Sequence, residues 1–297
     1  MIFKGEFSKM KVLVIGANGQ LGSDVFKEFL ERGEEVIPIN HDRMDVVDIS
    51  QCKDTVKQIR PELVINTAAM HNIESCEEDP LKSFEVNGIG ARNIALLSNE
   101  YDFTMMHIST DYVFDGIKKS PYVETDLTRP LNVYGNSKLA GEHFVNTIAK
   151  RYFVIRVSGL YGNNPCRAKG GRNFVNLMLK LARERDEVRV VDDEILTPTY
   201  TANIAKQIIK LTESDAYGLY HVTAQGSCSW YQFAAKIFEL TKAKVKLSVA
   251  GPDEFLMKVL RPKYSVLKNQ QLQNIDVDIM PHWEKGLKDY LNSSGNL

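Results

Sequence analysis

The chain of 297 residues has few cysteines, almost no net charge and no long apolar run. Its four cysteines, at positions 52, 76, 166 and 228, lie too far apart for the paired spacing of zinc ligands, and nothing indicates a secreted disulfide framework. We therefore expect free thiols in a reducing compartment. The 37 basic and 38 acidic residues nearly cancel, so the sequence carries no electrostatic signature of binding to nucleic acid or to an anionic membrane.

Membrane and secretion signals are not evident either. No apolar stretch approaches the length that spans a bilayer, and Lys4, Glu6 and Lys9 interrupt the first ten residues, where a signal peptide would be apolar. We expect a cytoplasmic protein, with residues 1–9 as an extension outside the fold. A chain that is 43% apolar can bury one large core, or one core with a smaller appended domain, and a small-molecule ligand is the default expectation.

The first half of the chain alternates short β-branched runs with longer amphipathic segments. This pattern is typical of a parallel sheet covered by helices on both faces. The expected strands are 12–15, 36–39, 63–65, 104–108 and 152–156. We therefore predict a doubly wound, Rossmann-like α/β domain over residues 11–160, with a dinucleotide at the carboxyl ends of its strands.

Beyond residue 160 the rhythm is looser and predicts a smaller region, mainly substrate-binding, over residues 161–297. It is expected to form a cap over the carboxyl ends of the strands, while elements near 188–222 return to the main sheet. The expected helices are 173–185, 201–211, one that begins near Trp230 with Ser227 or Ser229 as its cap, and 283–291. The expected strands are 188–191, 219–222 and 244–249.

A glycine-rich turn follows the first expected strand. Gly16, Gly19 and Gly22 recur every third residue between a strand and a helix, where small residues let backbone N–H groups approach a pyrophosphate. An ordinary tight turn is the alternative interpretation. The cofactor contacts predicted here are Gly16, Asn18, Gly19, Gln20 and Leu21.

The tip of the second expected strand bears on the choice of cofactor. Asn40 stands where NAD-selective folds place a carboxylate, and Arg43 could accept a 2′-phosphate. We therefore expect NADPH, with NADH as the alternative because Asp42 lies nearby and Arg43 could be a solvated loop charge. The remaining predicted cofactor contacts are Asp45 and Val46 after this tip, and Ala68 and Ala69 in the small-residue end of the third strand.

Tyr134 and Lys138 form a Tyr-x-x-x-Lys pair that can move a proton. On a helix both side chains leave the same face one turn apart, and a nearby ammonium would lower the tyrosine pKa from about 10 towards neutrality. Thr110, at the end of the fourth expected strand, could reach the same substrate oxygen. The structural alternatives are a turn cap for Thr110, a half-buried aromatic for Tyr134 and a surface lysine for Lys138.

Together these motifs resemble the extended short-chain dehydrogenase/reductase superfamily and, within it, the dTDP-4-dehydrorhamnose reductase family. The strings that carry the resemblance are 16–22, 109–116, 130–142 and 261–265. The resemblance implies transfer of a hydride from the nicotinamide to the C4 ketone of a deoxysugar nucleotide, as in the step from dTDP-4-dehydrorhamnose to dTDP-rhamnose. In it, Tyr134 is the proton donor, Lys138 holds the nicotinamide ribose and Thr110 bonds the substrate oxygen. Expected substrate contacts are Thr110, Tyr134, Asn173 and Arg261.

Three departures from the family pattern fall on the substrate side. Gly159 stands where the family commonly has tryptophan, segment 70–74 differs from the usual string, and segment 193–199 lacks the usual Gln and Gly before Pro-Thr. We expect Gly159 to leave open space, so a different sugar nucleotide or 4-keto sugar remains an option. Tyr112 after Asp111 replaces the glutamate usual in dehydratases, which favours simple reduction.

Two other functions stay open. A non-catalytic nucleotide-binding subunit, like the beta subunit of methionine adenosyltransferase, would share the fold and the nucleotide site, although the intact Thr110, Tyr134 and Lys138 favour an enzyme. A sugar-nucleotide epimerase would keep its cofactor bound and recycle it. The sequence leaves open whether the protein is a monomer or a homodimer and whether it needs magnesium, and no metal-binding residue is predicted.

Overall fold

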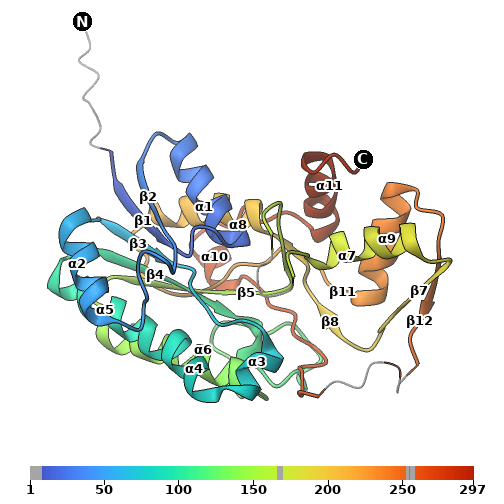
Figure 1. The fold of residues 1–297 in the computed structure, drawn as a ribbon, viewed down its shortest axis with the longest axis horizontal. Helices are drawn as coiled ribbons and strands as arrows, with labels where there is room; N and C mark the ends of the chain where they lie inside the picture. Colours follow the sequence, from blue (N-terminus) through green and yellow to red (C-terminus); the bar gives the residue numbers. More distant parts are fainter. Residues whose placement is uncertain (1–8, 166–169, 252–253, 255–257) are drawn as a thin grey trace, which may run out of the picture.

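A parallel sheet with helices on both faces forms the larger part of the protein, as Figure 1 shows for the computed structural model. The structure describes residues 9–165, 170–251, 254 and 258–297, so the expected extension, except Lys9, and Cys166 lie outside it. Among these residues six parallel strands pair in the order β10-β5-β4-β3-β1-β2. The strands are β1 (Lys11–Ile15), β2 (Glu35–Ile39), β3 (Leu63–Asn66), β4 (Thr104–Thr110), β5 (Tyr152–Val157) and β10 (Gly218–His221). The predicted doubly wound fold is confirmed.

Alternating side chains of the strands build a separate core on each face of the sheet. Val12 and Val14 pack into one core, whereas Leu13 and Ile15 point to the other, as the period of two in a strand requires. The first core is covered by α1 (Gln20–Glu31), α8 (Thr201–Thr212) and α10 (Gln270–Asn274). The second is covered by α2 (Ile49–Ile59), α5 (Gly90–Glu100) and α6 (Val133–Ile148).

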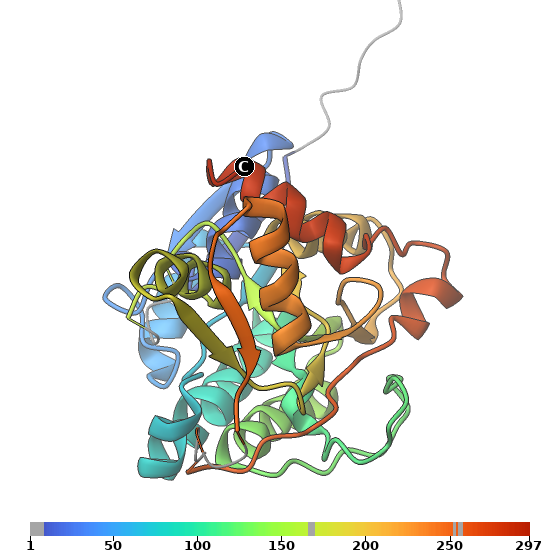
Figure 2. The same ribbon diagram turned by 90° about the vertical axis from the view of Figure 1, so that its right-hand side faces the viewer.

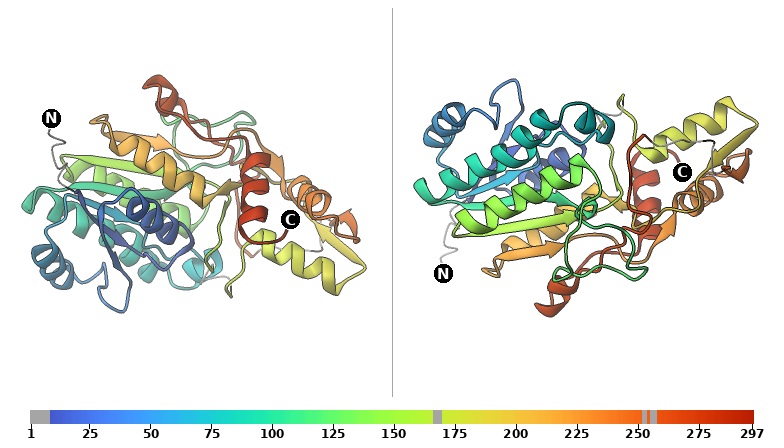
Figure 3. Two further views of the ribbon diagram at one scale, coloured as in Figure 1. Left: turned by 90° about the horizontal axis from the view of Figure 1, so that it is seen from above. Right: turned by 90° about the horizontal axis from the view of Figure 1, so that it is seen from below.

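The smaller region stands at one end of the sheet (Figure 3). Its helices α7 (Phe174–Glu184), α9 (Trp230–Thr241) and α11 (Trp283–Ser293) share a core rich in aromatic residues. Three short strand pairs complete it: β6 (Leu160–Tyr161) with β9 (Thr199–Tyr200), β7 (Glu187–Val190) with β12 (Lys246–Val249), and β8 (Ile195–Leu196) with β11 (Cys228–Ser229). Figure 2 shows α9 and β12, both orange, side by side.

Two expectations for this region are refined. Of the strands expected to return to the main sheet, β10 pairs with β5, but β7 pairs with β12 because its buried residues Val188 and Val190 belong to the aromatic-rich core. Ser229, not Ser227, caps α9. It forms a capping box in which its side chain accepts from Gln232 N and the Gln232 side chain accepts from Ser229 N.

Short helices surround the carboxyl ends of β3 and β4. The segment after β3 forms α3 (Ile73–Glu78), α4 (Pro80–Phe84) and the π-helix η1 (Glu85–Ile89), which runs directly into α5. A 3-10 turn, η2 (Asp111–Val113), follows β4. These elements all contact α6, so they decide where the first turns of α6 sit.

Close packing explains two of the three glycines in the glycine-rich turn. Gly16 has a left-handed φ of +79°, and a Cβ there would lie 2.7 Å from Thr67 Oγ1. A Cβ on Gly22 would lie far inside contact distance of the Gly16 carbonyl oxygen. Only glycine at position 22 therefore lets α1 start so close to the end of β1.

We predict that Gly22→Ala lowers the free energy of unfolding, because its methyl group meets backbone that cannot rotate away. Overpacking of this kind costs about 1–3 kcal/mol. Thermal or urea unfolding measures it. The matched control is Gly251→Ala, which meets no described atom within 4 Å and should change stability by less than about 0.5 kcal/mol. Equal stability of the two variants would contradict the packing argument.

Candidate functional site

The start of α1 is open to a ligand. Gly19, its N-cap, provides no side-chain hydrogen bond, and a Cβ built there would meet only the Gly16 oxygen, at 3.3 Å. The free N–H groups and the positive end of the helix dipole can therefore accept a phosphate. Leu21 is buried in the core, so only its backbone can take part, and Gln20 Nε2 donates to Gly162 O at 3.3 Å.

The tip of β2 carries an unsatisfied polar atom. Asn40 Oδ1 is buried and has no hydrogen-bond partner among the described residues. A buried acceptor without a donor is costly, and a ligand with hydroxyl donors would relieve that cost. Arg43 is exposed beside this tip, and no ion pair with it is found in the described part of the chain.

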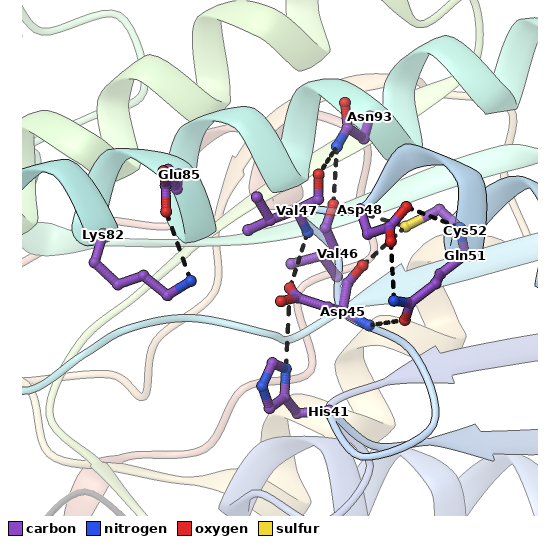
Figure 4. Close-up of polar contacts among 10 residues, drawn as sticks. All are labelled: His41, Asp45, Val46, Val47, Asp48, Gln51, Cys52, Lys82, Glu85 and Asn93. Atoms are coloured by element: carbon purple, nitrogen blue, oxygen red, sulfur yellow. Dashed lines mark hydrogen bonds and ion pairs between the residues drawn. The ribbon is translucent and has the colours of Figure 1, made fainter.

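Several polar contacts hold the segment after this tip, as Figure 4 shows. Asp45 Oδ1 accepts from Val47 N at 3.0 Å and lies 3.9 Å from His41 Nδ1. Asn93 Nδ2 donates to the carbonyl oxygens of Val46 and Val47, both at 3.0 Å. Asp45 and Val46 are thus fixed beside the tip of β2, where their predicted contact with the cofactor remains a prediction.

The end of β3 lies against the glycine-rich turn. Thr67 Oγ1 donates to Ile15 O at 2.7 Å, and Asn66 Oδ1 accepts from Ala68 N at 3.1 Å. Ala68 and Ala69 are half-buried at this edge. The structure therefore brings the predicted cofactor residues of the ends of β1, β2 and β3 to the same edge of the sheet.

The three predicted catalytic side chains meet at the next strand of that edge. Thr110 ends β4 and lies near Tyr134 in the first turn of α6. The Thr110 hydroxyl donates to Asp111 Oδ1 at 3.0 Å and accepts from Tyr112 N at 3.2 Å. Tyr134 is half-buried, with its ring edge-on to Tyr112 at a centroid distance of 5.7 Å. A Cβ at Gly135 would collide with the Tyr112 carbonyl, so this glycine lets η2 approach the start of α6.

The expected effect of Lys138 on Tyr134 is wrong for this structure. Burial is the largest influence on Tyr134 and raises its pKa above 10, while the nearby Thr110 hydroxyl opposes the rise. Lys138 Nζ donates to Ile108 O at 2.6 Å and lies 3.3 Å from His107 Nε2. Because its ammonium points at the strand and not at the phenol, Tyr134 stays protonated, the form that a proton donor needs.

Several buried polar residues that the sequence analysis missed hold α6 in place. Asn87 in η1 donates to Ser137 Oγ at 2.9 Å and to Met70 O at 2.9 Å, and Ser83 shares a 2.9 Å hydrogen bond with Ser137. Ser137 directly precedes Lys138. No local pattern marks these residues, although π-turns such as η1 are frequent at functional sites.

Asn173 and Arg261, the two other predicted substrate contacts, differ in whether the described protein occupies all their polar side-chain groups. Asn173 caps α7, and its Nδ2 donates to Gly162 O at 2.9 Å and to Tyr290 Oη at 3.0 Å, so its side chain is committed within the protein. Arg261 Nη2 donates to Glu74 Oε1 at 2.5 Å, but its buried Nε has no partner in the described residues. Arg261 also lowers the pKa of Tyr112, which burial raises, and therefore lies near the catalytic edge.

Gly159 does not leave open space, contrary to expectation. It has a left-handed φ of +58°, and a Cβ there would lie 2.8 Å from Thr197 O and 3.0 Å from Leu196 Cδ1. Thr199 N donates to Gly159 O at 3.0 Å. Two of the three departures from the family pattern therefore contact each other, because segment 193–199 fills the place that a side chain at 159 would need.

Neither a metal site nor a membrane span is found in the described ranges. No group of three or more His, Cys, Asp or Glu side chains there is arranged to hold a metal ion. No described helix is both long and apolar enough to cross a bilayer. Cys52, Cys76 and Cys228 are buried free thiols.

Comparison with known proteins places the chain in a family. The family model of the RmlD substrate binding domain matches residues 10–295. The chain is 39% identical to the spore coat polysaccharide biosynthesis protein SpsK of Bacillus subtilis, over 95% of this chain and 96% of that protein. It is 32% identical to dTDP-4-dehydrorhamnose reductase of Escherichia coli, over 95% and 97% of the two chains.

A solved structure is similar over almost its whole length. The dTDP-4-dehydrorhamnose reductase of Bacillus anthracis, solved in complex with NADP, has a TM-score of 0.91 and 38% identity, covering 96% of this chain and 99% of that one. The match therefore extends through both the sheet and the smaller region. The chain belongs to the RmlD substrate-binding-domain family.

Proposed function

We propose that this protein uses NADPH to reduce the C4 ketone of a nucleotide-linked 4-keto-6-deoxysugar, with dTDP-4-dehydrorhamnose as substrate and dTDP-rhamnose as product. The observation that carries the proposal is that Thr110, at the end of β4, lies near Tyr134 in the first turn of α6, one helical turn from buried Lys138 at the carboxyl edge of the sheet. The names of the relatives from E. coli and B. anthracis support the same substrate. A cytoplasmic place in the synthesis of cell-surface polysaccharide, as a monomer or homodimer, belongs to this proposal.

The residues fit a nicotinamide dinucleotide. The open N-terminus of α1 suits a pyrophosphate, and the unpaired Asn40 Oδ1 suits a ribose hydroxyl. When bound, the cofactor supplies the hydride. The B. anthracis relative binds NADP, which supports NADPH as the cofactor, with NADH as the alternative.

The chemistry follows from where the three catalytic side chains lie. A ketone that receives a hydride becomes an alkoxide, which needs a proton and hydrogen-bond donors within reach. Tyr134 Oη donates that proton, and the Thr110 hydroxyl bonds the same oxygen. Lys138, one turn away on α6, holds the nicotinamide ribose in this proposal, and the nearby Thr110 hydroxyl favours the phenolate left behind.

Burial of Lys138 favours an enzyme over a nucleotide-binding subunit. Its side chain is 2% exposed, and no carboxylate forms an ion pair with it in the described part of the protein. Lysine is almost never fully buried without such a partner, because desolvation of the ammonium destabilises the fold. A subunit that only bound nucleotide would have no use for so unfavourable a group beside a tyrosine.

A panel of nucleotide-linked 4-keto sugars, assayed with NADPH and NADH, tests the proposal. We expect NADPH oxidation with dTDP-4-dehydrorhamnose and formation of dTDP-rhamnose. Binding of the cofactor without turnover of any sugar would support the regulatory subunit. Purified protein that carries tightly held NAD and returns it to its starting redox state after each turnover would support the epimerase.

Replacement of the proton donor gives a second test. Tyr134→Phe should lower kcat by about a hundredfold to ten-thousandfold, the usual contribution of general acid catalysis, with the fold and NADPH binding unchanged. Tyr152→Phe is the matched control. Tyr152 begins β5, at the end of the strand opposite Val157, and its hydroxyl bonds Asn146. Unchanged turnover by the Tyr134 variant would refute its role.

Cofactor choice is tested at the tip of β2. If Arg43 bonds the 2′-phosphate, Arg43→Ala should weaken NADPH binding by about 1.5–3 kcal/mol, as expected for a hydrogen bond to a charged group, and leave NADH nearly unaffected. Fluorescence titration with both cofactors measures the difference. Arg185→Ala, at the exposed end of α7, is the control. Equal losses for the two cofactors would show that Arg43 does not contact the 2′-phosphate.

A further inference from the structure

Glu142 lies on the catalytic face of α6. Tyr134, Lys138 and Glu142 are spaced four residues apart, so their side chains leave the same face of the helix on successive turns. Like Lys138, Glu142 is buried, with 6% of its surface exposed. Two oppositely charged side chains thus lie one turn apart inside the protein.

The same three side chains meet three consecutive residues of β4. Lys138 Nζ donates to Ile108 O at 2.6 Å, Glu142 Oε1 accepts from Ser109 Oγ, and Tyr134 lies near Thr110. The partners of Lys138 and Glu142 are thus consecutive residues of the strand, although no ion pair joins the two side chains in the described part of the protein. The two hydrogen bonds to Ile108 and Ser109 set the register between α6 and the end of β4, where Thr110 lies.

Arg156 fixes the carboxylate of Glu142 from the adjacent strand. In β5, Arg156 Nε donates to Oε1 at 2.9 Å and Nη2 donates to Oε2 at 2.6 Å. The guanidinium is 3% exposed and lies 5.1 Å from the centroid of the Phe114 ring. A bidentate pair of this kind holds both oxygens in one orientation and keeps the negative charge at a fixed distance from Lys138.

We propose that Glu142 is a positioning residue for the reduction: it acts through Lys138, whose positive charge it maintains beside Tyr134, and through Ser109 it aligns Thr110. This inference rests on the proposed function, because it assigns Glu142 a task in the same site. It differs from a purely structural role in one respect. The negative charge of Glu142, and not only its packing, must matter.

The electrostatics around Lys138 support this assignment. Burial lowers the pKa of Lys138 to about 8, and the charge of Glu142 opposes that fall. His107, which contacts Lys138 from β4, stays neutral because burial and Lys138 hold its pKa well below 6.5. The elements α4, η1 and α5 contact this face of α6 through the uncharged residues Ser83, Asn87 and Ala91.

The other titratable or charged groups near this cluster do not supply a negative charge to Lys138. Arg156 is paired with Glu142, and His221 of β10 is neutral because burial lowers its pKa to about 3. Burial raises the pKa of Asp111 after β4 and of Cys76 in α3, and neither group acts on the pKa of Lys138. Glu142 is therefore the negative charge that opposes deprotonation of Lys138.

The sign of the pH effect follows directly. The site is active while Lys138 carries its proton, so activity is lost as the pH rises through the pKa of Lys138. Loss of the Glu142 charge lowers that pKa, and the loss of activity should then begin at lower pH. A shift of about one pH unit is the lower end of what a close opposite charge produces.

The test compares variants that separate the charge of Glu142 from the packing of the pair. Glu142→Gln removes the negative charge. The double variant Glu142→Gln with Arg156→Met removes both charges of the pair. It guards against misfolding, because neutral replacement of a buried pair is often tolerated. Arg156→Met alone breaks the pair but keeps the carboxylate. Glu142→Asp keeps the charge. Glu124→Gln is the control, because Glu124 is a buried carboxylate near Arg156 but not on α6.

The readouts are kcat/KM against pH and the affinity for NADPH against pH, each with a thermal melt. We expect the alkaline limb of both profiles to move to lower pH by about one unit in the two variants that lack the Glu142 charge. The variants Glu142→Asp, Arg156→Met and Glu124→Gln should not show this downward movement. The inference would be overturned if the alkaline limb lay at the same pH in all variants, or if it moved to lower pH by the same amount in Arg156→Met or Glu124→Gln.

Failure of the proposed function would be seen separately. If the wild type turns over no 4-keto sugar nucleotide, the proposed reaction is wrong, whereas the NADPH profile still reports the charge of Lys138. A downward movement of that profile only in the variants without the Glu142 carboxylate would keep the inference about Glu142. Its absence there would refute it independently of any sugar substrate.

Discussion

The contact between α6 and the last three residues of β4 is the constraint on which the site depends. Ile108 and Ser109 each bond one side chain of α6, and Thr110 lies near Tyr134, so the helix cannot slide without breaking these contacts. From the opposite side, Ser83 and Asn87 hold the turn that contains Ser137. Tyr134 is thus placed against Thr110 by interactions that lie deeper in the protein than either residue, which is how a fixed geometry for proton transfer is obtained.

Burial shifts the pKa values of Tyr134 and Lys138 in opposite directions. Desolvation raises the pKa of Tyr134 and lowers that of Lys138 to about 8, because in each case it disfavours the charged form. The phenol is therefore protonated and ready to donate at neutral pH. Lys138 keeps its charge at neutral pH by a small margin, so that nearby charges on α6 and β5 can influence the reaction although they do not touch the substrate.

Much of this could be predicted from the sequence because the signals are local. Period-two strands, the spacing of Gly16, Gly19 and Gly22, and a tyrosine four residues before a lysine indicate the sheet, its ligand edge and the catalytic helix without any knowledge of long-range contacts. The pairing of β7 with β12 could not be predicted from the sequence, because pairing with a strand of the main sheet would satisfy the same apolar pattern. The filling of the space at Gly159 by Leu196, and the direction in which Lys138 points, depend on side chains that meet only after folding.

The central claim is that a hydride and a proton arrive at the same carbonyl group of a sugar nucleotide in this site. NADPH deuterated at the transferable position of its nicotinamide tests it most directly, with the product examined by NMR and mass spectrometry after reaction with dTDP-4-dehydrorhamnose. The account predicts one deuterium, bound to C4 of the product sugar, with the new hydroxyl proton taken from solvent through Tyr134. A sugar product without deuterium at C4 would contradict it.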